Sequence, residues 1–292
     1  MGRARAGRWF LLPGLLFLFA IDLLPLLYSA WVSLYDWWLV RPRDVRFVGL
    51  GNYWRLAGDA ELGRAVVVTG LFTAGAVLIE FLAGLGLALL FAQPFRFLRP
   101  IRVLMLLPLF VVPVVGATMW RVIFHPEVGV LNYYLDLVGL GRPPWLSDPT
   151  LALVSIALVD AWRTIPFMFL VIYAGLEVLP AELFEAAAVD GASGWQAFRH
   201  ITVPLLTYIM LLAVLIRGMD AFREFDIIFV LTGGGPGTAT QTIQVLNYRL
   251  FGLGHMGQAN ALAIVTLILV AVLCYLLMRA TLRPSAHAGA GA

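Results

Sequence analysis

The sequence contains no lysine, and all 20 of its basic residues are arginines. A P-loop places a lysine against the phosphates of its nucleotide, so this chain cannot hold a P-loop ATPase site. An enzyme that works through a lysine Schiff base is excluded as well. Cys274 is the only cysteine and stands in an apolar segment. One cysteine allows neither an internal disulfide nor a thiolate metal site, so we expect Cys274 to be an inert packing residue and expect no metal here.

Charge is also scarce in this chain. Only 13% of the residues are charged and 61% are hydrophobic, whereas about 25% of the residues in a soluble domain are charged. About 20 apolar residues cross the hydrocarbon core of a bilayer as a helix. The composition therefore predicts an all-α, polytopic membrane protein with six transmembrane helices. We expect spans at residues 9–31, 65–92, 103–124, 151–176, 203–231 and 259–278, the third of them broken by Pro108 and Pro113.

The first apolar run has two interpretations, because a basic segment precedes it. A signal peptide has a basic region followed by a hydrophobic region in the same order. The run is long for a signal peptide, and Asp22 and Pro25 interrupt it. We therefore favour an uncleaved first transmembrane helix that follows a tail at residues 1–8.

The distribution of arginine predicts the orientation in the membrane. Arginines gather in short segments of cytoplasmic loops, where acids contribute little to orientation. The segments that fit this rule contain Arg3, Arg5 and Arg8; Arg96, Arg99 and Arg102; Arg199; and Arg279 and Arg283. Six spans would then leave both termini in the cytoplasm, with residues 284–292 as a disordered tail rich in small residues.

The polar loop at residues 180–204 is the longest stretch in the second half of the chain that a bilayer would reject. Pro180 suits the first turn of a short helix, and Gly191 can supply the left-handed residue that ends it. Ser193 can cap a second short helix to about Phe198, and Pro204 marks the start of the next span. Such a loop is either an ordinary interfacial segment or a helix that docks into a groove of a partner.

The residues of this loop resemble a known family. Glu185-Ala186-Ala187, then Asp190-Gly191-Ala192, then Ile201 and Pro204 have the spacing of the EAA loop of binding-protein-dependent ABC importer permeases. Further segments are similar to carbohydrate-uptake permeases of the maltose, trehalose and glycerol-phosphate type. These segments are His125-Pro-Glu-Val-Gly129-Val-Leu-Asn132, Trp162-Arg-Thr-Ile-Pro166-Phe-Met, Ala174-Gly-Leu and Thr232-Gly-Gly-Gly-Pro236-Gly-Thr-Ala-Thr240. The chain resembles the shorter six-span members, because it lacks the extra spans and large outer domain of the larger maltose permease subunit.

The resemblance implies a type I importer transmembrane domain at residues 9–283, in the cytoplasmic membrane of a bacterium or archaeon. It implies a transport subunit that is not itself an enzyme and holds no cofactor. Its partners would be a sister permease, an extracytoplasmic sugar-binding protein, membrane lipid, the sugar, and two ATP-binding subunits that carry ATP and magnesium. No nucleic acid is implied.

The resemblance also gives the loop a role in coupling to the ATP-binding subunits. Glu185 would pair with a basic group of an ATP-binding subunit, and Gly191 would permit the turn. Ala186 and Ala187 would allow close approach, and Asp190 would cap the helix or form a salt bridge.

Charged residues within the spans are the candidates for a substrate pathway. A charge at the bilayer centre costs about 2.5–3.5 kcal/mol, so these residues should face the bundle interior or water. Arg217, Asp220 and Glu224 share one helix face, which predicts pairing of Arg217 with Asp220 and, nearby, of Arg223 with Asp226. Asp160 and Arg163 are spaced in the same way. These groups either line a sugar pathway or form structural ion pairs.

Trp162 is a further pathway candidate, because its ring could stack on a sugar or simply pack. The resemblance favours a disaccharide or oligosaccharide as substrate. Glycerol phosphate remains open, because arginines are available to meet a phosphate.

The glycine-rich segment Gly233, Gly234, Gly235 and Pro236 most simply ends the fifth helix. Its functional interpretation is an outer gate or a contact with the binding protein.

Two rival functions remain at this point. Gly191-Ala-Ser193-Gly194 matches the short motif of a rhomboid-type serine protease, with His200 and His255 as possible bases. A secondary sugar transporter is the other rival, although the EAA-like loop would then have no evident purpose.

Overall fold

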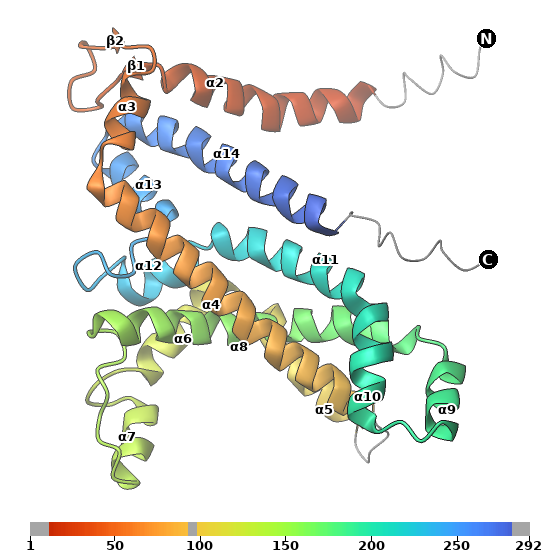
Figure 1. Ribbon diagram of the computed structural model, residues 1–292. Coiled ribbons are helices and arrows are strands. Elements are labelled where there is room, and N and C mark those ends of the chain that lie inside the picture. The colour runs from red at the N-terminus through yellow and green to blue at the C-terminus, as the bar shows by residue number, and fades with distance from the viewer. Residues whose placement is uncertain (1–11, 93–97, 282–292) are drawn as a thin grey trace, which may run out of the picture. The chain divides into compact units, whose positions relative to one another are not determined.

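The computed structural model describes residues 12–92 and 98–281, and helices dominate this part of the chain (Figure 1). The predicted tails at 1–8 and 284–292, as well as Arg96 and Arg283, lie outside the described residues. The strands are β1 (Tyr35–Asp36) and β2 (Arg46–Phe47). The helical elements are η1 (Phe19–Leu23), α2 (Leu24–Val32), α3 (Gly51–Ala57), α4 (Ala60–Phe91), α5 (Leu98–Leu106), η2 (Leu107–Phe110), α6 (Pro113–Ile123), α7 (Val130–Leu137), α8 (Pro149–Glu177), α9 (Ala181–Val189), α10 (Gly194–Ala197), η3 (Phe198–Thr202), α11 (Val203–Phe222), α12 (Asp226–Thr232), α13 (Ile243–Gly252) and α14 (Met256–Thr281).

Five helices within the described residues are long and apolar enough to cross a membrane, and a bent helix pair supplies up to one more. The all-α, polytopic architecture is therefore confirmed. The five helices are Leu12–Val32, Ala60–Phe91, Pro149–Glu177, Gly194–Phe222 and Met256–Leu276.

The bent pair falls where the third span was predicted. Pro100–Phe110 and Pro113–Ile123 meet at an angle of 100°. Val111 and Val112 between them are extended, with ψ of 126° and 133°. A residue before proline avoids the helical conformation, and Pro113 has no N–H to donate into a preceding turn. The prolines thus separate α5 and η2 from α6.

The fifth span ends earlier than the predicted 203–231. The helix that begins at Gly194 stops at Phe222, and α12 begins only at Asp226. The break contains Arg223 and Glu224, whose side chains turn to partners described below. The prediction was wrong because apolar residues continue on both sides of this charged break.

The described residues divide into two compact units. Residues 12–64 and 246–269 make up the first unit, which includes the antiparallel pair β1–β2. Buried Asn52 donates from its side-chain nitrogen to the carbonyl oxygens of Ser33 and Tyr35 at 2.8 and 2.9 Å. Trp38 stacks on His255 with 5.2 Å between ring centroids. The hydrogen bonds tie α3 to the segment after α2, and the stacked rings tie that segment to the residue before α14.

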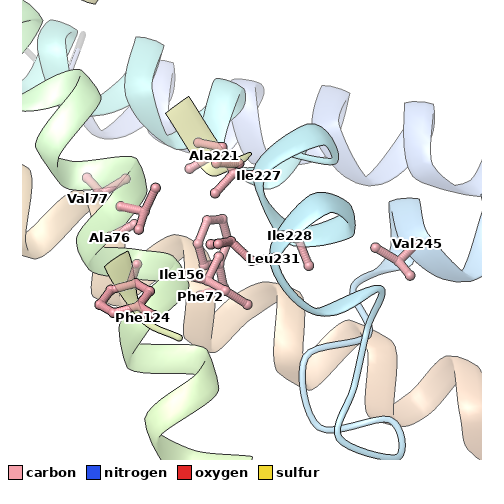
Figure 2. Close-up of a cluster of buried hydrophobic side chains, with 13 residues drawn as sticks. Phe72, Ala76, Val77, Phe124, Ile156, Ala221, Ile227, Ile228, Leu231 and Val245 are labelled. Atoms are coloured by element: carbon pink, nitrogen blue, oxygen red, sulfur yellow. The ribbon is translucent and has the colours of Figure 1, made fainter. Parts of the chain in front are cut away.

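The second unit contains residues 65–92, 98–245 and 270–281. Its larger apolar core draws side chains from α4, α8, α11 and α12, as the converging residues in Figure 2 show. Phe72, Ile156 and Leu231 are buried in this core. A second core around Phe169, Met168 and Leu206 joins α4, α8 and α11. These cores hold α12 against α6 and α8, beside the charged break that follows α11.

Candidate functional site

The turn after α9 has the hydrogen bonds of a Schellman motif. The Gly191 N–H donates to the Ala188 carbonyl at 3.1 Å, and the Ala192 N–H donates to the Ala187 carbonyl at 2.9 Å. Gly191 has φ of +75°, which a residue with a Cβ rarely adopts. The predicted helix at 180–190 and its left-handed glycine are therefore confirmed.

A capping box begins the next helix. The Ser193 N–H donates to Gln196 Oε1 at 2.7 Å, and Ser193 Oγ accepts from the Gln196 N–H at 3.4 Å. Ser193 thus caps α10 as predicted. The helix then continues through η3 into α11 without a break at Pro204. The second helix is therefore the first part of the next apolar helix, a correction to the expectation of a separate short helix.

The α9 segment presents both charge and apolar surface outward. Glu185 and Asp190 are exposed, and neither carboxylate forms an ion pair with another residue in the described ranges. Leu183 is 42% exposed and Val189, the last residue of α9, is 87% exposed, while Trp195 in the following helix α10 is 66% exposed. Ala186 and Ala188 add small exposed side chains between them, while Ala187 is half-buried. A short helix with such a surface is suited to a partner that covers it.

A buried ion cluster joins three helices of the second unit. The Arg217 side chain on α11 donates from Nε and Nη2 to the two carboxylate oxygens of Glu80 on α4, at 2.6 and 2.8 Å. Arg217 Nη2 also donates to Asp160 Oδ2 on α8 at 2.8 Å. The side chains of Glu80 and Asp160 are 0% exposed, and that of Arg217 is 4% exposed. The predicted pairing of Arg217 with Asp220 is wrong, because the guanidinium pairs instead with carboxylates on two other helices.

Two further arginines of the same unit also pair with carboxylates. Arg163 Nη2 lies 3.4 Å from Asp160 Oδ1, as the spacing predicted, and 3.6 Å from Glu224 Oε2. Arg223 Nη2 lies 3.1 Å from Asp220 Oδ1 and not against Asp226. The predicted Arg223–Asp226 pair assumed a continuous helix, and the chain leaves the helix at Arg223.

The Glu224 carboxylate also holds the start of α12. Glu224 Oε1 accepts the Ile227 N–H at 3.1 Å, which satisfies one of the unpaired donors in the first turn of that helix. Glu224 therefore contacts the first turn of α12 and, as shown below, also lines a cavity.

A cavity of about 460 Å³ opens beside the ion cluster. Of the predicted pathway residues, Arg163, Arg217, Asp220 and Glu224 line it. Trp162 is not among its lining residues and packs against Trp120, with 5.7 Å between ring centroids. The full lining is Leu109, Arg163, Thr164, Phe167, Arg217, Asp220, Arg223, Glu224, Phe225 and Asp226. Charged groups with a few apolar side chains give this cavity both donors and acceptors for a polar ligand.

Glu80 was missed at the level of sequence, although a signal was present. It is the only ionisable residue in the apolar stretch 65–92. A lone carboxylate in such a stretch is costly unless it meets a cation, so it calls for a partner on another helix. Sequence spacing finds partners on the same helix only, which is why Arg217 was assigned to Asp220.

The glycine-rich segment ends α12 and not α11. Gly233 takes the left-handed conformation after Thr232, with φ of +61°. The loop that follows is held by hydrogen bonds: Thr232 Oγ1 and Thr240 Oγ1 lie 2.7 Å apart, and Thr240 Oγ1 donates to the Gly235 carbonyl at 2.7 Å. The predicted helix end is confirmed, one helix later than expected.

Comparisons with known proteins agree with these features. A family model described as a binding-protein-dependent transport system inner membrane component matches residues 80–285. The trehalose/maltose transport system permease protein MalF of Thermococcus litoralis is 36% identical over 273 residues, covering 91% of this chain and 90% of that protein. The trehalose transport system permease protein SugA of Mycobacterium tuberculosis is 34% identical over 281 residues, covering 96% of this chain and 89% of that protein.

Solved structures show the same fold. A chain from the crystal structure of a bacterial ABC transporter involved in the import of the acidic polysaccharide alginate has a TM-score of 0.83, with 22% identity and 97% of both chains covered. The match extends over nearly the whole of both chains, so the arrangement of helices is one already seen in a transporter.

Proposed function

This chain belongs to the family of inner membrane components of binding-protein-dependent transport systems, and we propose that it is a permease chain of an ATP-driven carbohydrate importer. Membership makes it a multi-pass membrane transport component and not an enzyme. The carbohydrate substrate is supported by relatives whose names assign them trehalose or maltose. The same relatives support a disaccharide or oligosaccharide over a smaller ligand.

The proposal includes three kinds of protein partner. A sister permease completes the pathway, and a binding protein delivers the sugar from outside the cell. The binding protein is supported as a partner by a structural relative crystallised in complex with a pentasaccharide-bound periplasmic protein. Two ATP-binding subunits, with ATP and magnesium, supply the energy, because the chain has no lysine for a P-loop of its own.

The exposed, capped α9 segment carries the coupling part of the proposal. Glu185 and Asp190 lie at a surface with apolar side chains around them, and Gly191 sets the turn that places α9 beside the start of the long Gly194–Phe222 helix. A push on α9 is then transmitted to the ion cluster through that continuous helix. Ala186 and Ala187 would lie against the ATP-binding subunit, which would provide a basic group for Glu185.

The cavity carries the pathway part of the proposal. Arg163, Arg217, Asp220 and Glu224 provide hydrogen-bonding groups inside an otherwise apolar bundle. Gly233, Gly234, Gly235 and Pro236, after α12, would contact the binding protein or gate the outer mouth. Because Glu224 touches both the cavity and the first turn of α12, a substrate in the cavity would influence the segment that leads to this gate.

Two rival functions have less support. The Ser193 hydroxyl of the protease-like motif donates to Gln196 Oε1 at 2.9 Å, so it serves a helix cap. His200 Nδ1 lies 3.0 Å from the Gln196 carbonyl, so this ring also contacts backbone and not Ser193. A secondary transporter needs no ATP-binding partner, and it leaves the α9 surface without a purpose.

The test is ATP hydrolysis by the complete transporter in lipid, with the binding protein titrated against a panel of sugars. Wild type should hydrolyse ATP faster only with one class of loaded binding protein. Glu185→Lys should abolish this stimulation or prevent assembly with the ATP-binding subunits, because it reverses the charge at the docking surface. Glu127→Lys, the same change at an exposed position after α6, is the matched control and should couple normally.

Normal stimulation of an assembled Glu185→Lys transporter would refute the docking role of α9. Uptake that continues at constant ATP supply without the ATP-binding subunits, but stops when the proton gradient collapses, would instead favour the secondary transporter.

A further inference from the structure

The three guanidinium groups that line the cavity are all engaged by carboxylates. Arg217 gives three hydrogen bonds to Glu80 and Asp160 at 2.6–2.8 Å. Arg163 lies between Asp160 and Glu224, and Arg223 pairs with Asp220. Each arginine that lines the cavity therefore already has a carboxylate within 3.6 Å, and an anionic ligand would have to compete with it.

Carboxylates outnumber guanidinium groups around the cavity. The cavity lining provides Asp220, Glu224 and Asp226, and Glu80 and Asp160 stand directly behind it. These five acids face three arginines, so the site and its supporting wall carry two formal negative charges in excess. Asp226 lies in the first turn of α12 and takes part in none of the ion pairs described above.

The surplus of carboxylates discriminates between two kinds of sugar. A phosphate, sulfonate or uronate group pairs best with a guanidinium or ammonium group, and here it would compete for each guanidinium with a carboxylate that already lies beside it. The Glu224 side chain is only 10% exposed, and the lower dielectric around a buried group strengthens its repulsion of a ligand anion. A neutral hydroxyl meets no such barrier, because it donates to a carboxylate and accepts from a guanidinium at the same time.

We infer that this cavity accepts neutral polyhydroxylated ligands and rejects anionic carbohydrates, with Glu224 and Asp226 as the residues that set this charge preference. The inference rests on the proposed function, and it removes the reason for keeping glycerol phosphate as a substrate. It also distinguishes this chain from its structural relative, which comes from a transporter involved in the import of an acidic polysaccharide. The arginines that suggested a phosphate each have a carboxylate partner, which lies on another helix for Arg217 and three residues earlier in the chain for Arg163 and Arg223.

Glutamine and asparagine variants can test this preference without removing the side chains. In Glu224→Gln the amide oxygen can still accept the Ile227 N–H, and Asp226→Asn keeps the shape of its side chain. The double variant therefore removes two negative charges at the cavity. Asp136→Asn is the matched control, because Asp136 is exposed, pairs with Arg142 and lies outside the cavity.

The experiment uses the complete transporter in proteoliposomes to establish ATP-dependent uptake, and then the assembled membrane complex without binding protein. Binding of radiolabelled maltose or trehalose, whichever is taken up, is competed with maltose and with its anionic oxidation product maltobionate. Leaving out the binding protein ensures that its own selectivity does not decide the result.

In wild type, maltobionate should compete at least about tenfold more weakly than maltose, as expected for repulsion between unit charges in a protein interior. The Glu224→Gln, Asp226→Asn double variant should reduce this ratio several-fold, and Asp136→Asn should leave it unchanged. Equal competition by the two sugars, or a ratio that the double variant does not alter, would overturn the charge preference alone. Failure to take up any carbohydrate with ATP would overturn the proposed function, and this inference with it.

Discussion

At the scale of single residues, Arg217 is the side chain whose loss should be most damaging to stability. Arg217→Met would leave Glu80 and Asp160 buried, with the bidentate partner of Glu80 removed. Removing one member of a buried pair costs about 3–5 kcal/mol, because the remaining charge stays uncompensated. We expect a lower melting temperature and less intact transporter after heating, measured by size-exclusion chromatography of the purified complex.

Two further variants separate this effect from a general loss of charge. Arg142→Met removes an exposed partner of Asp136, where both side chains are about half exposed, and should cost about 0–1 kcal/mol. Glu80→Gln combined with Arg217→Met removes the orphaned carboxylate as well, and should recover part of the stability lost by Arg217→Met. If the double variant is no more stable than Arg217→Met alone, the uncompensated Glu80 charge is not the cause.

The residue scale also shows where sequence reasoning stops. The Asp160–Arg163 pair was predicted, because both residues lie one turn apart on the same helix. Glu80 and Arg217 are 137 positions apart, and their contact depends on how α4 and α11 pack. Helical spacing carries no information about that packing. Only the isolation of Glu80 in an apolar stretch indicated that a distant cation had to exist.

At the scale of elements, close packing of α4 on α8 depends on Gly84. A Cβ built at Gly84 would lie 2.8 Å from the Met168 side chain and 3.0 Å from the Phe169 nitrogen. Gly84→Leu should therefore force the two helices apart, at a cost of about 1–3 kcal/mol for overpacking. Reduced thermal stability of the purified complex would report this change.

The same helix provides the control for Gly84. A Cβ at Gly86 would meet nothing within 4 Å, and Gly86 is exposed. Gly86→Leu adds the same side chain two positions along α4 and should leave stability close to that of wild type. Equal losses for the two variants would mean that leucine in α4, and not the contact with α8, is responsible.

Some helix boundaries could be predicted from the sequence and others could not, because only some of them are set by local backbone chemistry. Gly191, Ser193 and Pro113 act locally, so their effects on the cap, the helix start and the helix break could be anticipated. The end of α11 at Phe222 could not, because neither a proline nor a glycine marks it. There the chain turns where Glu224 finds Arg163 and the first turn of α12, and both contacts belong to the tertiary structure.

At the scale of the whole molecule, the bent α5–α6 segment decides the orientation of everything after it. If Pro100–Phe110 and Pro113–Ile123 together cross the membrane, the protein has six spans and both termini share one side. If the bent pair re-enters and leaves on the same side, the count is five, and α9 changes sides. Arginine-rich short segments support six spans and a cytoplasmic α9.

The single cysteine makes this orientation measurable. In a Cys274→Ser background, Arg43→Cys, Glu127→Cys and Glu182→Cys each place one thiol at an exposed position, respectively before α4, after α6 and in α9. A membrane-impermeant maleimide applied to right-side-out vesicles holding the complete transporter should label the thiols at positions 43 and 127. The thiol at position 182 should react only after the vesicles are opened.

A different labelling pattern identifies the alternative directly. A re-entrant α5–α6 segment puts position 127 on the same side as the loop after α4, so positions 43 and 182 would be labelled and position 127 protected. That result would place α9 outside the cell, beyond the reach of any ATP-binding subunit. Because Arg43 and Glu127 share a side only when the bent pair crosses, comparing these two thiols tests the span count independently of which side faces the cytoplasm.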